Sequence, residues 1–117
     1  MINATSISVS ALNAFQKKMD VTADNVANVL TDDFEKSRVT FQEKASGGVS
    51  AVIDRVEIID IQKKTIGNDE LVTVQSSNVD LSEELTNIIS TTAAYKANLT
   101  SVKTQEDMTG ALLDILG

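Results

Sequence analysis

Hydrophobic side chains recur at steps of three and four residues in two long stretches, one toward each end of the chain. This spacing places the side chains along one side of a helix and is typical of helices that pack lengthwise against one another. No proline interrupts either stretch. The pattern predicts two long helices, over residues 6–31 and 80–115. Their apolar or near-apolar seams consist of Leu12, Phe15, Met19, Thr22, Val26 and Val29, and of Leu81, Leu85, Ile88, Thr92, Tyr95, Leu99 and Val102.

Polar residues mark where the predicted helices end and begin. Thr31, Asp32 and Asp33 form a stop signal, because short polar side chains compete with the helix for backbone hydrogen bonds. Asp80 is suited to cap the second helix, and Glu83 follows it at the spacing of a capping box.

The segment between the helices, residues 38–76, has a different pattern. It is rich in Val and Ile, most of all over Val49–Ile61, and turn signals lie at 46–48 and 67–69. We expect two or three short antiparallel strands here. The fold class predicted for residues 1–117 is a mainly α single domain, in which two long terminal helices form an elongated coiled-coil-like hairpin with a small antiparallel β insertion.

The length of the second helix bears on function. At 1.5 Å per residue it should extend for roughly 50 Å, whereas a compact domain of this size has a radius of gyration of roughly 13 Å. Such a helix lies either in an elongated hairpin or in contact with other chains. A protein whose best-specified surfaces are helical seams is built to pack rather than to catalyse.

The first helix carries a second line of residues, also spaced by seven: Ile7, Ala14 and Val21. At 100° per residue this line lies more than a quarter-turn from the Leu12 line. Two explanations are open: one line serves the partner helix and the other a neighbouring subunit, or the helix is buried broadly in a single core.

Composition removes several functional classes. The chain of 117 residues has a net charge of −7 and contains neither Cys nor His. Disulfides, thiolate or imidazole metal sites and a histidine general base are therefore excluded. Acidic balance disfavours nucleic acid and anionic lipid, and no segment has the length and apolarity of a membrane span. We expect no cofactor, no metal ion, no small-molecule substrate, no nucleic acid partner and no membrane insertion.

Candidate catalytic groups do not form a recognisable set. The acidic residues near Asp32 lack the alternating spacing of a calcium loop. Glu83 and Glu84 are adjacent, so they project about 100° apart on a helix and do not form a carboxylate pair. Tyr95 on an apolar seam is more typical of a core residue than of an acid or base. The protein is predicted not to be an enzyme.

Two sequence motifs at opposite ends resemble a known family. The N-terminal motif comprises residues 11–16 and Met19–Val29, followed by Thr31–Phe34. The C-terminal motif comprises Ser77–Leu81, Glu84–Leu85, Ile88–Ile89, Ala94–Asn98 and Thr104–Met108. Together they resemble the signatures of the bacterial flagellar rod, hook and hook-filament axial proteins.

The chain departs from the family pattern at three places. Asp24 stands where the motif has its first Asn, and Thr92-Ala93 replaces the usual Gln-Arg. Asp33 replaces the Gly before the aromatic residue, so a residue less suited than Gly must occupy the left-handed turn conformation. The segments Asn78–Asp80 and Arg38–Gln42, with the short middle, are most similar to proximal-rod members of the FlgC type.

The resemblance implies a structural subunit of the flagellar basal-body rod that polymerises into a helical tube and transmits torque. It implies other rod subunits and the flagellar type III export apparatus as partners, export without a cleaved signal peptide, and termini that become ordered on assembly. The alternative is a soluble helical-hairpin adaptor or chaperone that dimerises through the same seams.

Residues on the two seams are the candidate contacts between subunits, and Asn25 and Asn28 are candidate polar contacts that fix register. The full set is Leu12, Phe15, Met19, Asn25, Val26, Asn28, Val29, Leu85, Ile88, Tyr95, Asn98, Leu99 and Val102.

Overall fold

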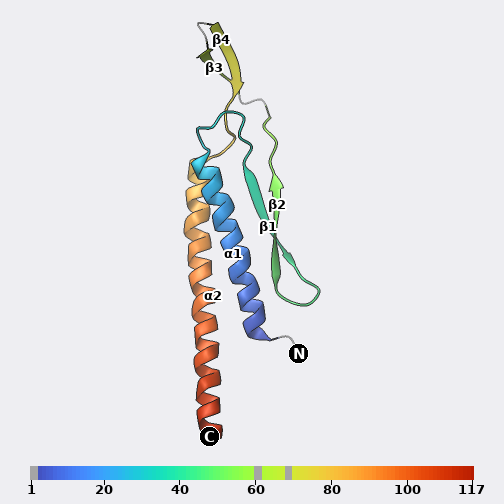
Figure 1. Ribbon diagram of the computed structural model, residues 1–117, viewed down its shortest axis with the longest axis vertical. Coiled ribbons are helices and arrows are strands. Elements are labelled where there is room, and N and C mark those ends of the chain that lie inside the picture. Colours follow the sequence, from blue (N-terminus) through green and yellow to red (C-terminus); the bar gives the residue numbers. More distant parts are fainter. Residues whose placement is uncertain (1–2, 60–61, 68–69) are drawn as a thin grey trace.

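The computed structural model describes residues 3–59, 62–67 and 70–117. The molecule is a rod of 80 × 25 × 19 Å, built around two antiparallel helices (Figure 1). Its radius of gyration, 20.8 Å, exceeds the roughly 13 Å of a compact domain of this size. The elements in chain order are α1 (Ala4–Ala27), β1 (Ser37–Glu43), β2 (Val49–Arg55), β3 (Gln62–Gly67), β4 (Glu70–Gln75) and α2 (Leu81–Leu116). The predicted fold class, a helical hairpin with a β insertion, is confirmed.

Helix α1 begins two residues before its predicted start and ends four residues before its predicted end. Asn3 caps the start, since its Oδ1 accepts a hydrogen bond from the backbone N of Thr5 at 3.0 Å. At the other end, Asn28 Nδ2 donates to the backbone O of Asp24 at 2.9 Å. The predicted end at residue 31 was wrong, because the i→i−4 backbone bonds stop at Asn28 and the backbone N of Val29 and of Thr31 each donate to the carbonyl three residues earlier, at 3.3 and 3.0 Å, as in tight turns.

Helix α2 matches its prediction within one residue at each end. The Asp80 cap is confirmed, because its Oδ1 accepts from the backbone N of Ser82 at 2.9 Å and of Glu83 at 3.2 Å. The capping box is only half formed. The Glu83 carboxylate instead accepts a hydrogen bond from Lys36 Nζ at 2.8 Å, which ties the start of α2 to the segment before β1.

The middle forms two separate antiparallel hairpins, β1–β2 and β3–β4, so the expectation of two or three strands was too low. The predicted turn at 46–48 joins β1 to β2, where Gly47 and Gly48 both have positive φ. Of the apolar run Val49–Ile61, the part up to Arg55 is strand β2 and residues 56–59 are not in a strand, whereas 60–61 lie outside the described residues. The predicted turn at 67–69 joins β3 to β4, although 68–69 also lie outside them.

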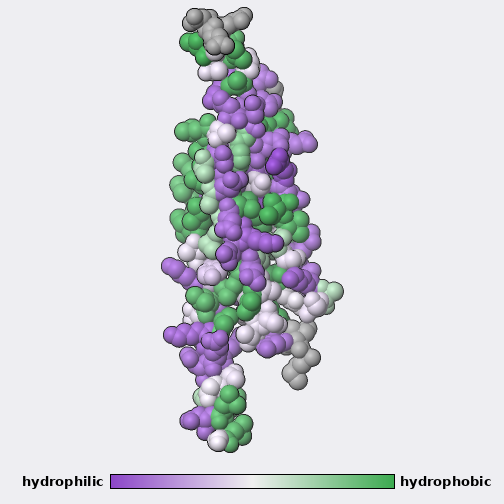
Figure 2. Space-filling view, in the orientation of Figure 1, coloured by the Kyte–Doolittle hydropathy of each residue, from purple (hydrophilic) through white to green (hydrophobic). Residues whose placement is uncertain are grey.

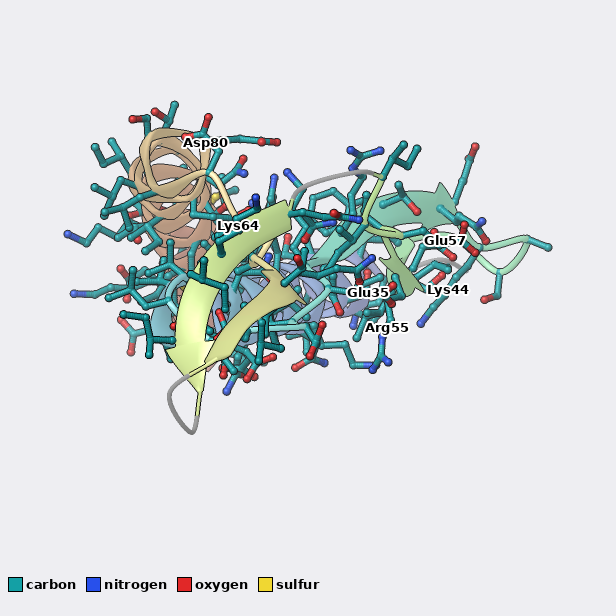
Figure 3. The ribbon with its side chains drawn as sticks, turned by 90° about the horizontal axis from the view of Figure 1, so that it is seen from above. Glu35, Lys44, Arg55, Glu57, Lys64 and Asp80 are labelled. Atoms are coloured by element: carbon teal, nitrogen blue, oxygen red, sulfur yellow. The ribbon has the colours of Figure 1, made fainter. Side chains whose placement is uncertain are left out.

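Helix α1 lies between α2 and the β1–β2 hairpin, as the view along the long axis shows (Figure 3). The sheet packs on α1 through an edge-to-face contact between Phe15 and Phe41, whose ring centroids are 5.3 Å apart at 85°. Ala14, which belongs to the second line of α1, borders a shallow depression together with Val49 and Ala51 of β2. The second line of α1 therefore faces the hairpin of its own chain, which favours the explanation of broad burial within one subunit.

The turn of this hairpin touches α1 at Ser10. The Ser10 hydroxyl donates to the backbone O of Ile7 at 2.7 Å and accepts from the backbone N of Val49 at 3.1 Å. A Cβ on Gly48 would overlap that hydroxyl oxygen, and the Gly48 φ is +86°. Glycine is required here for both reasons.

Replacing Gly48 by Ala should therefore destabilise the isolated protein by about 1–3 kcal/mol. The matched control is Gly110→Ala in α2, where an added Cβ meets no atom within 4 Å and should stabilise the helix by about 1 kcal/mol. Urea unfolding followed by circular dichroism compares the two. Equal midpoints for the two variants would contradict the contact between the turn and α1.

Candidate assembly interface

Two side-chain contacts define the register of α1 against α2. Thr5 Oγ1 donates to Gln105 Oε1 at 3.0 Å near the start of α1, and Thr92 Oγ1 lies 3.9 Å from Met19 Sδ near its middle. The separations of 14 residues on α1 and 13 on α2 agree with lengthwise antiparallel packing. The coiled-coil-like arrangement therefore extends over most of α1.

The face of α2 that meets α1 differs from the predicted seam. Glu84 and Thr91 are the buried residues of α2, each with 4% of its surface exposed. Four predicted contact residues are half-buried beside them: Ile88, Tyr95, Asn98 and Val102. Leu85 and Leu99, predicted on the same seam, are instead 48% and 50% exposed. The face that meets α1 is rotated relative to the predicted seam. In a helix with 3.6 residues per turn, several adjacent rows of side chains fit the same apolar spacing, so the spacing does not specify which row faces α1.

Burial within the subunit is unusually polar. Among the described residues, Ala14 is the one buried hydrophobic side chain, whereas Thr22, Asn25, Glu84 and Thr91 are buried polar ones. Hydrophobic burial is the main favourable term in folding. A subunit that leaves most of its large apolar side chains partly or largely exposed therefore has considerable apolar surface still to bury.

Part of this exposed surface lies along one side of α2, and we name these residues the outer stripe: Leu81, Leu85, Ile89 and Leu99. These residues fall within about 80° of one another on a helical wheel, and they are 44%, 48%, 72% and 50% exposed. The space-filling view shows hydrophobic side chains gathered along the α2 side of the molecule (Figure 2). Ile89 was not among the predicted contact residues. Because consecutive residues point to different sides of a helix, the pair Ile88-Ile89 already indicated that α2 has two apolar faces.

The predicted contact residues of α1 mostly serve the subunit itself. Leu12, Met19, Val26 and Val29 are half-buried. Phe15 was assigned to the helix seam, but it packs on β1 through Phe41. Helix α1 thus contacts elements of its own chain on two sides, and the larger free surface belongs to α2.

Asn25 has a specific task within the subunit. Only 1% of its surface is exposed. Its Oδ1 accepts from the backbone N of Ser37 at 2.9 Å and its Nδ2 donates to the backbone O of the same residue at 2.8 Å. The Asn25 side chain thereby pairs with both the backbone N–H and the backbone C=O of Ser37, as a neighbouring β-strand would. We therefore assign Asn25 to holding the start of β1, and it has little surface left for another subunit.

A second asparagine, Asn78, completes this arrangement and was not singled out as a contact residue. Its Oδ1 accepts from the backbone N of Lys36 at 2.7 Å, and its Nδ2 donates to the backbone O of Val56 at 2.8 Å. The backbone N of Val56 in turn donates to the backbone O of Lys36 at 2.9 Å. The two asparagines, one near the end of α1 and one just before α2, hold the base of the β1–β2 hairpin beside the helix pair.

The remaining predicted polar residues bond locally. Asn28 caps α1, and Asn98 Nδ2 donates to the backbone O of Ala94 one turn earlier. Asp33, which stands at the family's glycine position, has φ of +59°. Its backbone N donates to the backbone O of Gln75 at 2.9 Å, so the strained turn also connects the end of α1 to the end of β4. The expected left-handed conformation at this residue is confirmed.

The described part of the chain contains neither a metal-binding cluster of acidic residues nor a helix that could span a membrane. Within residues 3–59, 62–67 and 70–117, no group of three acidic side chains is arranged to hold a metal ion. None of the helices described has both the length and the apolarity to cross a membrane.

Comparisons with known proteins match both ends of the chain. The family model described as flagella basal body rod protein matches residues 6–34, which contain almost all of α1 and the turn at Asp33. The model described as flagellar basal body rod FlgEFG protein C-terminal matches residues 73–115, which contain almost all of α2. The chain belongs to the flagellar basal body rod protein family. The two matched regions carry the helical hairpin, and the segment between them carries most of the β insertion.

A curated relative agrees with this membership. The flagellar basal-body rod protein FlgG of Bacillus subtilis (strain 168) is 44% identical over 46 residues. The match covers 39% of this chain and 17% of the relative. This family consists of structural proteins of the flagellar basal body rather than enzymes, which confirms the structural, non-enzymatic role predicted from the sequence. The narrower resemblance to the FlgC type stays a prediction.

Proposed function

We propose that this rod family protein is a subunit of the proximal rod, which polymerises through its terminal helices into a helical tube and transmits torque. The observation that carries the proposal is the outer stripe, a band of large hydrophobic side chains that are 44–72% exposed on α2. Exposed apolar bands of this kind are typical of surfaces that bind another protein. A helix of 36 residues also presents this band over a length suited to lateral packing.

The shape of the subunit supports a load-bearing role. Its two helices run along the long axis of an 80 Å molecule, so neighbouring copies packed side by side would form a wall of helices aligned with that axis. The backbone hydrogen bonds along each helix together resist both stretching and bending of that helix. The β1–β2 hairpin is held beside the helix pair by Asn25 and Asn78, which would keep it in a fixed orientation while the helices carry force.

The expected partners are other rod subunits and the flagellar type III export apparatus, through which the chain would pass without cleavage of a signal peptide. The elongated hairpin suits passage through a narrow channel as an unfolded chain, because few buried apolar contacts have to be broken.

Isolation of basal bodies tests this function. In a strain that lacks the gene and carries it on a plasmid, the protein should co-purify with basal bodies with its N-terminal residues intact by mass spectrometry. Loss of the gene should abolish swimming and leave no assembled rod by electron microscopy. A discrete cytoplasmic dimer together with complete basal bodies in the deletion strain would contradict the proposal and favour the adaptor alternative.

A further inference from the structure

Helix α2 continues well beyond the start of α1. The Thr5–Gln105 hydrogen bond lies at the first turn of α1, which begins at Ala4, whereas α2 runs on to Leu116. The residues from 106 onward are all exposed. Eleven further helical residues extend for about 16 Å, and Figure 1 shows this end of α2 reaching past the N-terminal end of α1. We name residues 106–116 the α2 overhang.

The rows of α2 that face α1 continue into the overhang with the same seven-residue spacing. One row, Glu84, Thr91, Asn98 and Gln105, next reaches Leu112, and a second row, Ile88, Tyr95 and Val102, passes Thr109 to reach Leu116. Up to Gln105 the residues of both rows are buried or half-buried against α1. Leu112 and Leu116 occupy the same rows but are 60% and 83% exposed. The contact face thus becomes more apolar where its partner helix has ended.

We propose that a second copy of this chain continues the seam by packing end to end, with the α2 overhang of one copy against the opposite end of the next. This inference rests on the proposed polymerisation and specifies one of its contacts. Its support is the continuity of the overhang with the α1–α2 interface, because Leu112 and Leu116 extend rows whose other members already pack on a helix. In the next copy, the end of the molecule where α1 ends would then lie in line with the α1–α2 seam of the first copy.

That opposite end also exposes large hydrophobic side chains. Leu30, just past the end of α1, is 88% exposed, and Ile66 and Leu71, which are paired across the β3–β4 hairpin, are 77% and 71% exposed. Figure 1 shows this end of α1 and the β3–β4 hairpin far from the C-terminal end of α2. Each copy therefore carries an apolar surface at both ends, as a chain of copies requires.

Charge disfavours the symmetric alternative. The overhang contains Glu106, Asp107 and Asp114 and no Lys or Arg. A contact between two overhangs would bring three carboxylates from each copy together, and like charges across an interface are costly. A contact between different surfaces forms a ring if its rotation closes and an open filament if it does not, and displacing each copy lengthwise gives the filament.

Cysteine cross-linking provides a direct test, because the chain has no native Cys. The variant carries both Leu30→Cys and Leu116→Cys. A disulfide needs Cα atoms within about 7 Å. Leu30 follows the end of α1, near the start of α2, whereas Leu116 lies at the other end of that helix of 36 residues, so any bond between the two positions joins two copies. In oxidised basal bodies from cells producing this variant, we expect a ladder of multimers on non-reducing gels, which either single variant lacks.

The outcomes separate this contact from the proposed function. Multimers from Leu116→Cys alone would indicate overhang-to-overhang pairing and overturn the end-to-end contact. In a second double variant, Leu116→Cys is combined with Leu85→Cys instead of Leu30→Cys. Cross-linked multimers of this variant would show that the overhang packs sideways on the outer stripe, and would also overturn the end-to-end contact. A double variant that is incorporated into basal bodies but gives no multimers refutes this contact alone. Absence of the unmodified protein from basal bodies refutes the proposed function as well.

Discussion

Replacing Leu85 and Leu99 together by Asp should abolish rod assembly and swimming while leaving the subunit folded and expressed. Both side chains are about half exposed in the single chain, at 48% and 50%, and exposed substitutions usually change stability by only about 0.5 kcal/mol or less. In an assembled rod the same positions would lie against a neighbour. Burying an unpaired carboxylate there costs several kcal/mol per group, which is enough to prevent association.

Two matched variants control this experiment. Ser90→Asp with Ser101→Asp adds the same charge to α2 at exposed positions off the outer stripe, and should leave swimming close to normal. Leu85→Met with Leu99→Met keeps the apolar volume and should also swim. Soft-agar motility and the amount of protein in purified basal bodies are the measurements. Normal swimming of the double Asp variant would contradict the assignment of the outer stripe to subunit contacts.

Asn25→Asp should loosen the junction between α1 and β1. The substitution keeps the shape of the side chain and its acceptor for the backbone N of Ser37, but it removes the donor to the Ser37 carbonyl. It also places a carboxylate in a site where 1% of the residue surface is exposed. The expected cost is about 2 kcal/mol or more, which is at least about tenfold in the opening equilibrium of the junction.

Limited trypsin digestion measures this opening, because Lys36 and Arg38 flank Ser37 on either side. Cleavage after these residues follows the opening equilibrium when the junction closes faster than the protease cuts. We expect cleavage of Asn25→Asp to be at least about tenfold faster than that of the unmodified protein. Asn13→Asp, at an exposed position of the same helix, is the control and should be cut at the normal rate. Equal rates for the two variants would show that Asn25 does not hold β1.

Local signals in the sequence predicted the end of a helix correctly where a single side chain determines that end. Asp80 has an oxygen at the right distance for the first free backbone N–H groups of α2, so that helix begins where predicted. The end of α1 was missed because two signals compete there: the polar run 31–33 and, three residues earlier, Asn28. Only the path of the chain back to Ser37, which Asn25 holds, decides which signal ends the helix.

The candidate site divides in the same way. The seven-residue rows on α2 are present in the sequence, and the resemblance at both ends led to the flagellar rod family that the comparisons confirm. The row that faces α1 was not predictable, because rows of Leu, Ile, Val and Thr around α2 have similar apolar character. Polar residues at 84 and 91 proved to be the most buried, contrary to a hydrophobic ranking.

The sequence by itself determined that two long helices with apolar seams flank a β segment, since spacing, caps and turn residues act over a few positions. The tertiary structure alone decided that Asn25 and Asn78 bind backbone groups of the hairpin and that Leu85 and Leu99 face outward. It also decided that α2 extends beyond α1. The physical reason is that these outcomes depend on how segments far apart in the chain are rotated and shifted against each other, which a repeat along one segment does not specify.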